Sequence, residues 1–232
     1  FLGWSKDGSN TVNPTAQAIN ADTTFTALYT RGFVLGDGNG KVRPSDKINR
    51  AEFTKMLVTA SGKYDPQEDY AEVTFSDVNK NSWYASYIAC AVENGIVKGY
   101  NDNTFKPTDS ITREEAAQMI YNALENVTDV ESTDKITDFD SVSNWAKLAV
   151  ASLAEADIVK GYDDGSFKPK NVITRAEAAT MICRVEGFDP NAESKAEIVE
   201  AYDSPFTDLS KTSWSYVYIL YAAGELDDSY YA

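Results

Sequence analysis

A 22-residue segment recurs along this chain, and its regular spacing constrains the fold more than any other feature of the sequence. Residues 94–115 read NGIVKGYNDNTFKPTDSITREE, and residues 156–177 read ADIVKGYDDGSFKPKNVITRAE. A looser copy, FVLGDGNGKVRPSDKINRAE, occupies residues 33–52. Arg50, Arg113 and Arg175 hold the same place in the three copies, 63 and then 62 positions apart. Such recurrence is typical of a repeat architecture, in which each unit needs its neighbours to bury an apolar core.

Each copy ends at the start of a predicted helix. Thr112 is a favourable N-cap, and Glu115 follows it three residues later, which makes a capping box. The same pair recurs in the other copies as Asn49 with Glu52 and as Thr174 with Glu177. We therefore expect helices from Arg50 to about Ala60 and from Arg113 to about Glu125, with a third in the last copy.

Capping does not explain the arginine at the first position of each helix. The chain has six arginines, and three of them occupy this position, where the helix dipole disfavours a cation by roughly 0.3–1 kcal/mol. One interpretation is a solvated arginine or one paired with nearby acids. The other is a cation beside free backbone N–H groups, which together suit an anionic ligand.

A second kind of segment alternates with these copies. It has the form Phe-x-Asp, with Ile136 in place of Phe in one case, followed by Trp and an amphipathic helix. Its Asp and Trp residues are Asp77 with Trp83, Asp138 with Trp145, and Asp208 with Trp214. We call the arginine-bearing copies back halves and these segments front halves. Because the halves alternate strictly, we expect a mainly α fold of three helix-loop-helix repeats, interlocked around a pseudo-threefold axis.

Residues 1–30 differ from the rest, since they are rich in Thr and Asn and alternate from Thr24 to Leu28 as a strand does. We expect a short β segment there, ahead of the repeats. Because Phe1 begins in mid-pattern, we also expect the chain to be part of a longer protein. The predicted domains are the β-rich segment at 1–30, a first repeat with a partial front at 31–72, a second repeat at 73–134, a third repeat at 135–203 and a closing front half at 204–232.

Composition excludes several kinds of partner and site. A net charge of −15 and a pI of about 4.4 argue against nucleic acid and anionic lipid, and no apolar run predicts membrane insertion. The chain has no His, which removes the commonest general base and a leading metal ligand. Cys90 and Cys183 fall on apolar faces of predicted helices, so we expect free buried thiols. We therefore expect no cofactor, no metal and no catalytic residue.

The motifs F-x-D-V, W-Y, G-I-V-K-G-Y-x-D-x-x-F-x-P and I-T-R-E-E, in this order, resemble the S-layer homology repeat of bacterial surface proteins. The resemblance covers about residues 31–232. It implies a secreted, helical module that holds a protein non-covalently on the Gram-positive cell wall. It also implies that the ligand is a secondary cell-wall polysaccharide, which often carries a pyruvate ketal. Residues 1–30 resemble the end of an internalin B-type surface repeat, through Phe1, Gly3, Trp4 and Leu28–Tyr29, with Trp4 expected to pack.

The resemblance also implies a set of ligand-binding residues in grooves between the repeats, where one repeat's Arg would lie near the next repeat's Asp and Trp. These residues are Arg50, Arg113, Arg175, Asp77, Asp138, Asp208, Trp83, Trp145, Trp214, Gly99, Tyr100, Gly161 and Tyr162. Each Trp could equally belong to the core, and each Asp could equally cap the helix that follows it.

Two departures from the pattern bear on these grooves. Asp37 stands where the later copies have Tyr100 and Tyr162, so we expect the site near Arg50 to be the weaker one. The last front half ends near Asp227, so its groove is expected to be incomplete.

Two other classes of function compete with wall binding. A glycosidase would need two carboxylates at a defined separation in a cleft, whereas the acids here recur as caps or scatter along linkers. A structural or protein-binding module, for surface-layer assembly, self-association or adhesion, would not depend on the helix-start arginines.

Overall fold

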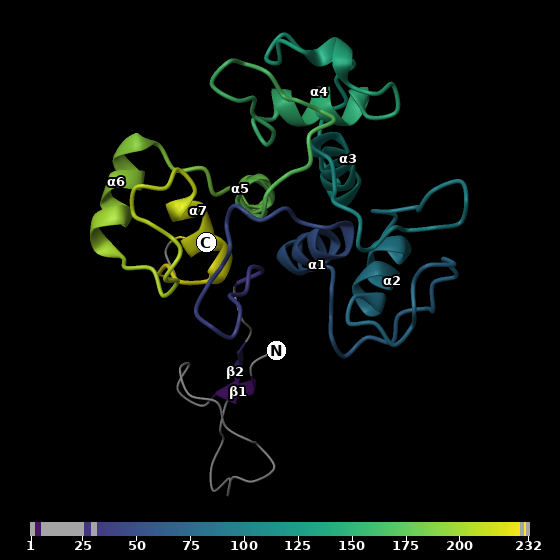
Figure 1. Ribbon diagram of the computed structural model, residues 1–232, viewed down its shortest axis with the longest axis horizontal. Helices are drawn as coiled ribbons and strands as arrows, with labels where there is room; N and C mark the ends of the chain where they lie inside the picture. Colours follow the sequence, from purple (N-terminus) through teal and green to yellow (C-terminus); the bar gives the residue numbers. More distant parts are fainter. Residues whose placement is uncertain (1–2, 6–25, 29–31, 228–229, 231–232) are drawn as a thin grey trace, which may run out of the picture.

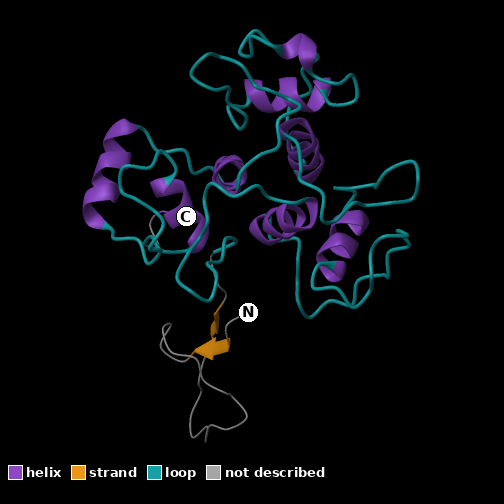
Figure 2. Cartoon of the chain, in the orientation of Figure 1, coloured by secondary structure: helices purple, strands orange, loops and turns teal. Residues whose placement is uncertain are grey.

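The computed structural model describes residues 3–5, 26–28, 32–227 and 230. Within these residues the fold is mainly α, as predicted, and loops separate the helices (Figure 2). Its elements are β1 (Gly3–Ser5), β2 (Thr26–Leu28), α1 (Arg50–Ala60), α2 (Ala85–Glu93), α3 (Arg113–Ala123), η2 (Phe139–Ser141), α4 (Lys147–Glu155), α5 (Arg175–Val185), α6 (Ala192–Ala201) and α7 (Tyr216–Ala223).

The three predicted capping boxes are present and fix where α1, α3 and α5 begin. In each box the N-cap side chain accepts from the third helical N–H group, and the Glu at that position accepts from the N-cap backbone. Loss of such a cap costs about 1 kcal/mol. The helices start at Arg50, Arg113 and Arg175, which confirms the starts read from the sequence.

The strand expected near Thr24–Leu28 is also present, over Thr26–Leu28, and pairs antiparallel with Gly3–Ser5. Figure 2 shows this hairpin, in orange, outside the group of helices. The packing predicted for Trp4 and the match at Phe1 and Tyr29 lie outside the described side chains.

The three back-half helices meet at the centre of the molecule, where a ring of backbone hydrogen bonds joins them. Ile48 N–H donates to Ile173 O (3.2 Å), Ile173 N–H to Ile111 O (3.1 Å), and Ile111 N–H to Ile48 O (3.2 Å). All three side chains are fully buried. Figure 1 shows α1, α3 and α5 around this centre and the front-half helices outside them. The predicted pseudo-threefold arrangement is therefore confirmed.

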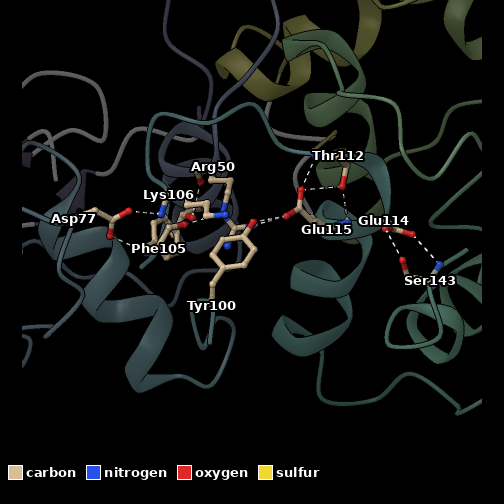
Figure 3. A network of polar contacts seen from close by, with 10 residues as sticks. Arg50, Asp77, Tyr100, Phe105, Lys106, Thr112, Glu114, Glu115 and Ser143 are labelled. Carbon is tan, nitrogen blue, oxygen red and sulfur yellow. Dashed lines mark hydrogen bonds and ion pairs between the residues drawn. The ribbon is translucent and has the colours of Figure 1, made fainter. Parts of the chain in front are cut away.

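Each front-half helix packs on the back-half helix that precedes it in the chain: α2 on α1, α4 on α3, and α7 on α5. A buried carboxylate adds a link in the second pair. Glu114 in α3 accepts from the Ser143 N–H group and hydroxyl, both at 3.0 Å, and from Lys170 Nζ at 2.5 Å. Figure 3 shows the Glu114–Ser143 contact.

The closing front half completes the first repeat. Phe33 and Val34 donate their N–H groups to Ala222 O at the end of α7, at 2.8 and 2.9 Å, and Thr207 N–H donates to Gly40 O at 2.9 Å. Gly32 leaves no room for a side chain, since a Cβ there would lie 2.4 Å from Ala223 O. The two ends of the repeat region thus interlock, and the last front half is not an isolated fragment.

Candidate functional site

The arginine at the start of each of α1, α3 and α5 joins one repeat to the next. Arg50 and Arg113 are only 7% and 5% exposed. Arg50 Nε donates to Phe105 O (2.9 Å), and its guanidinium lies 4.8 Å from the centre of the Tyr100 ring (Figure 3). Arg113 repeats this in the third repeat, with Nε donating to Phe167 O (2.7 Å) and the guanidinium 4.7 Å from the Tyr162 ring. A desolvated cation–π contact contributes about 2 kcal/mol, so both arginines stabilise the repeat junctions.

A tyrosine and a glutamate complete each of these two junctions. Glu115 Oε1 accepts from the Tyr100 hydroxyl (2.5 Å) and faces Arg50 Nη1 (3.3 Å), while its Oε2 accepts from Thr112 N–H. In the next junction Glu177 Oε1 accepts from the Tyr162 hydroxyl (2.6 Å) and faces Arg113 Nη1 (3.6 Å). The interpretation that these two arginines pair with nearby acids is therefore confirmed.

The tyrosines are held in their protonated form. Burial, followed by the hydrogen bond to the glutamate, raises the pKa of Tyr100 and of Tyr162 to about 12. Burial raises the pKa of Glu115 and of Glu177, but the hydrogen bonds they accept and the neighbouring arginine outweigh it, so both pKa values are lowered overall. Each phenol thus donates to an ionised carboxylate at neutral pH.

The third junction lacks the tyrosine. Arg175 is half-buried and donates from Nε to Val42 O (3.0 Å) and from Nη2 to Leu35 O (3.2 Å). Asp37 takes the tyrosine's place and accepts from the N–H groups of its own loop. We predicted this deficiency near Arg50, and that was wrong. Each arginine reaches the loop of the following repeat, so the loop at Asp37 belongs with Arg175.

The first backbone N–H groups of these helices are not free for an anion. Arg50 N–H donates to Asp109 O, and Ala51 N–H to Pro107 O, both at 3.0 Å. The third N–H group bonds the N-cap side chain. The corresponding groups of α3 and α5 bond Asn171 O and Pro169 O, and Asp46 O and Pro44 O. The interpretation of an open helix N-terminus was therefore wrong, because the neighbouring loop satisfies these donors.

The three front-half aspartates fix the loops of the back halves. Asp77 accepts from Phe105 N–H (2.8 Å) and Lys106 N–H (2.7 Å), as Figure 3 shows. Asp138 makes the same pair of bonds to Phe167 and Lys168, and Asp208 to Val42 and Arg43. The alternative that each aspartate caps the following helix does not hold, since α2, α4 and α7 have no side-chain cap.

Gly99 and Gly161 serve the same loops through their lack of a side chain. Gly99 has φ +71°, and a Cβ there would lie 2.3 Å from the Phe75 ring. A Cβ on Gly161 would lie 2.9 Å from Gly165 O. Their positions are explained by loop packing.

The tryptophans are exposed rather than part of the core. Trp83, Trp145 and Trp214 are 54%, 55% and 61% exposed. Trp83 lines a groove with Arg175, and Trp214 lines a groove with Arg113. The expected pairing of each Trp with the preceding repeat's Arg was wrong by one repeat for Trp83 and Trp214, and for Trp145 it stays a prediction. The front-half helix lies on the preceding back-half helix, and its Trp is carried there with it.

Two grooves between repeats therefore stand out, and we name them by their arginines. The Arg113 groove has a volume of about 800 Å³ and includes Tyr162, Glu177, Arg184 and Trp214 in its walls. The Arg175 groove has a volume of about 210 Å³ and includes Leu35, Glu52, Lys55 and Trp83. Trp214, from the closing front half, contributes to the larger one.

Three cationic groove residues escaped the sequence prediction: Lys55, Lys160 and Arg184. Lys55 and Arg184 lie outside the repeated motif, so repetition does not mark them. Lys160 lies inside it, in the V-K-G-Y run where the second repeat has Lys98, so repetition could have marked it. Helix geometry could have found two of them. Lys55 lies three residues after Glu52, and Arg184 seven after Glu177, so each shares a helix face with a motif residue.

The S-layer homology domain family matches the chain three times, at residues 15–54, 74–117 and 135–179, which is more than half of its length. The chain belongs to the S-layer homology family, and this places it at the cell surface, as predicted. The first match begins at residue 15, within the segment that we assigned to a separate β-rich repeat, so the boundary at residue 30 stays a prediction.

The similar proteins are much longer than the part that this chain matches. The chain is 36% identical over 166 residues to the exoglucanase XynX of Acetivibrio thermocellus, covering 70% of this chain and 15% of that protein. It is 32% identical over 193 residues to a cellulosome-anchoring protein of the same organism, covering 79% of this chain and 40% of that protein. It is 30% identical over 176 residues to the S-layer protein sap of Bacillus anthracis, covering 75% of this chain and 21% of that protein. The chain thus spans less than half of each relative's length.

Two further properties concern the described residues. None of the helices there has the length and apolar character needed to cross a bilayer. No group of three or more Cys, Asp or Glu side chains in the same residues is placed to hold a metal ion.

Proposed function

We propose that the chain anchors a larger protein to the cell wall without a covalent bond, by binding a secondary cell-wall polysaccharide in the grooves between its repeats. The observation that carries the proposal is the pairing, in both grooves, of an exposed tryptophan with arginine and lysine side chains. The presence of a cellulosome-anchoring protein and an S-layer protein among its relatives supports the same function.

The chemistry of the grooves suits an acidic sugar polymer. A tryptophan face can pack against the apolar face of a pyranose, and glutamates can accept hydrogen bonds from sugar hydroxyls. Arginine can fork onto a carboxylate, such as that of a pyruvate ketal. The chain's charge of −15 opposes an anionic ligand at long range. The Debye length of about 8 Å at physiological salt limits that repulsion, so the cations within the groove determine whether an anion binds.

We assign different roles to the predicted site residues. Trp83, Trp214 and Arg175 contact the polymer directly, and the exposed Trp145 does so as well. The remaining residues shape the grooves, either by joining repeats or by fixing loops: Arg50, Arg113, Tyr100, Tyr162, Asp77, Asp138, Asp208, Gly99 and Gly161.

We further propose that the chain is not itself an enzyme. It lacks the His on which most nucleophilic triads depend. The relatives with catalytic names are far longer than the part that this chain matches, which is 15% of the exoglucanase and 9% of an amylopullulanase. Catalysis in such proteins would then lie outside the region shared with this chain.

Co-sedimentation with purified cell walls tests the anchoring proposal. Intact walls are compared with walls stripped of their secondary polysaccharide, using the wild type, Trp214→Ala, Arg175→Gln and the control Lys80→Gln. Lys80 is an exposed residue in a long 4.0 Å ion pair with Glu72. We expect binding that requires the polysaccharide and falls in the two groove variants but not in the control. Undiminished binding of all four proteins to stripped walls would instead favour protein-mediated surface-layer assembly or self-association.

A further inference from the structure

In the Arg113 groove each of the three guanidinium nitrogens of the motif arginine already faces a partner. Arg113 donates from Nε to Phe167 O (2.7 Å) and from Nη2 to Lys160 O (3.2 Å), and Nη1 faces Glu177 at 3.6 Å. The side chain is 6% exposed. A carboxylate could reach both terminal nitrogens only by displacing groups that bury them, Glu177 and the Lys160 carbonyl. An anion in this groove therefore needs another cation.

Arg184, in the last turn of α5, meets that need. It lines the same groove and pairs through Nε with Asp189 Oδ1 at 3.3 Å, and its guanidinium lies 5.7 Å from the Tyr218 ring. Within the described residues, its two terminal nitrogens have no hydrogen-bonding partner. Its side chain is 16% exposed, so the guanidinium fork is held in place while its donors stay available.

Asp189 organises this end of the groove. It accepts from Lys160 Nζ and from the Tyr218 hydroxyl, both at 2.5 Å, in addition to pairing with Arg184. Burial raises the pKa of Asp189, but these hydrogen bonds and the charge of Arg184 lower it to about 2. One carboxylate thus holds two cations at the end of a groove whose walls also carry Asp163, Asp164 and Glu177. An anion there depends on direct bonds to Arg184 and not on a net positive charge of the groove.

The two arginines of this groove also repel each other. Burial lowers the pKa of Arg113, and the positive charge of Arg184 contributes to the lowering. Two guanidinium groups that line one groove are stabilised when an anion lies between or beside them. The other two repeats have Thr59 and Asn122 at the position of Arg184, and Asn122 Nδ2 is bonded to Ile96 O at 3.0 Å.

We propose that Arg184, supported by Lys160, binds the carboxylate of the wall glycan in the Arg113 groove, with the adjoining pyranose on Trp214, while Arg113 holds the two repeats together. The inference rests on the proposed function, since it names the residue and the ligand chemistry of the same site. In this proposal the Arg113 groove is the one that recognises the carboxylate of the glycan.

Calorimetric titration of the chain with soluble polysaccharide released from purified walls tests this assignment. The proteins are the wild type, Arg184→Gln, Arg184→Lys and the control Lys80→Gln, each with its thermal unfolding measured. We expect Arg184→Gln to weaken binding by about tenfold to a hundredfold. Arg184→Lys keeps the charge but loses the fork, so we expect a smaller loss.

The polymer is then used in two altered forms. Reduction of its carboxylates to alcohols removes every carboxylate, whereas mild acid hydrolysis removes only ketal-linked ones, so the two arms separate a ketal from a uronic acid. We expect wild type and Arg184→Gln to bind the reduced polymer equally. Unchanged binding of native polymer by a folded Arg184→Gln variant would overturn the inference and leave the proposed function intact. Failure of the wild type to bind any form would overturn both.

Discussion

The Arg113 and Arg175 grooves occupy equivalent places in the fold but are built differently. In the Arg113 groove, Tyr162 and Glu177 close over the arginine, which is buried with all its nitrogens engaged. In the Arg175 groove, Asp37 replaces the tyrosine, Glu52 keeps only its capping role, and the arginine is half-buried. The same motif residue is thus a junction in one place and an accessible cation in the other.

The comparison shows that recurrence in sequence does not guarantee recurrence of role. The closing front half completes the first repeat, which contains Asp37. The junction of this repeat with α5 is therefore where the two ends of the repeat region meet, and we call it the seam. The seam lacks the tyrosine–glutamate pair that stabilises the other two junctions. It keeps the contacts that all three repeats share: the bonds of Asp208 to Val42 and Arg43, and those of Phe33 and Val34 to Ala222 O.

The largest expected effect is a difference in stability between variants of the two arginines. We expect Arg113→Ala to lower the free energy of unfolding by about 3–5 kcal/mol, because it leaves Glu177 and a loop carbonyl without their buried partner. Arg175→Ala is expected to cost about 1 kcal/mol, since it has no buried acid partner. Urea denaturation of both variants measures the difference, and equal losses would remove the distinction between the grooves.

Tyr162→Phe should give the next largest effect, because it removes one hydrogen bond to an ionised carboxylate at the Arg113 junction. We expect a loss of about 1.5–2 kcal/mol in unfolding free energy. Tyr121→Phe is the matched control, since its hydroxyl bonds Asp129 on the surface. A loss at Tyr162 no larger than that of the control would contradict a role in the junction.

A pH-dependent effect should follow from the same tyrosines. Their pKa in the folded state is about 12, above the ordinary value of 10.0. A raised pKa contributes stability that is present below pH 10 and lost as the pH rises towards 12. We expect the stability of the wild type to fall over this range and that of Tyr100→Phe/Tyr162→Phe to fall less. Denaturant titration at each pH measures the stability of both proteins. Equal losses of stability in the two proteins would contradict a contribution from these tyrosines.

The smallest effect concerns Lys55 in the Arg175 groove. Its Nζ lies 5.8 Å from the Trp83 ring and 5.4 Å from the Tyr87 ring, a contact worth roughly 0.5–1 kcal/mol when exposed. We expect Lys55→Gln to weaken polysaccharide binding about twofold to fivefold in calorimetry and to leave thermal unfolding nearly unchanged. If Lys55→Gln weakened binding and also lowered the unfolding temperature, Lys55 would have a structural role instead.

The sequence sufficed for those parts of the fold that depend on local chemistry. The capping residues Asn49, Thr112 and Thr174 act within four residues of chain, so they place the helix starts without tertiary information. The strict alternation of halves was enough to predict the interlocked repeats, because each half has an apolar face that only a neighbour can cover.

The partners of each site residue could not be predicted, because they come from distant parts of the chain. Asp77 bonds a loop 28 residues away, and Asp208 one 166 residues away, so capping and loop contacts were equally compatible with the sequence. The assignment of Asp37 to Arg175 likewise depends on which loop each arginine reaches. Arg184 lacks a repeated counterpart, so repetition does not mark it, and its ion pair with Asp189 is seen only in the folded chain.

Titration of purified wall polysaccharide into the wild type and into Trp83→Ala/Trp214→Ala tests the central claim most directly, since both residues are exposed and neither joins two repeats. We predict that the wild type binds the polymer and that the double variant, with unchanged thermal unfolding, binds it at least about tenfold more weakly. Equal binding by the two proteins would contradict the claim that the grooves between repeats hold the polysaccharide.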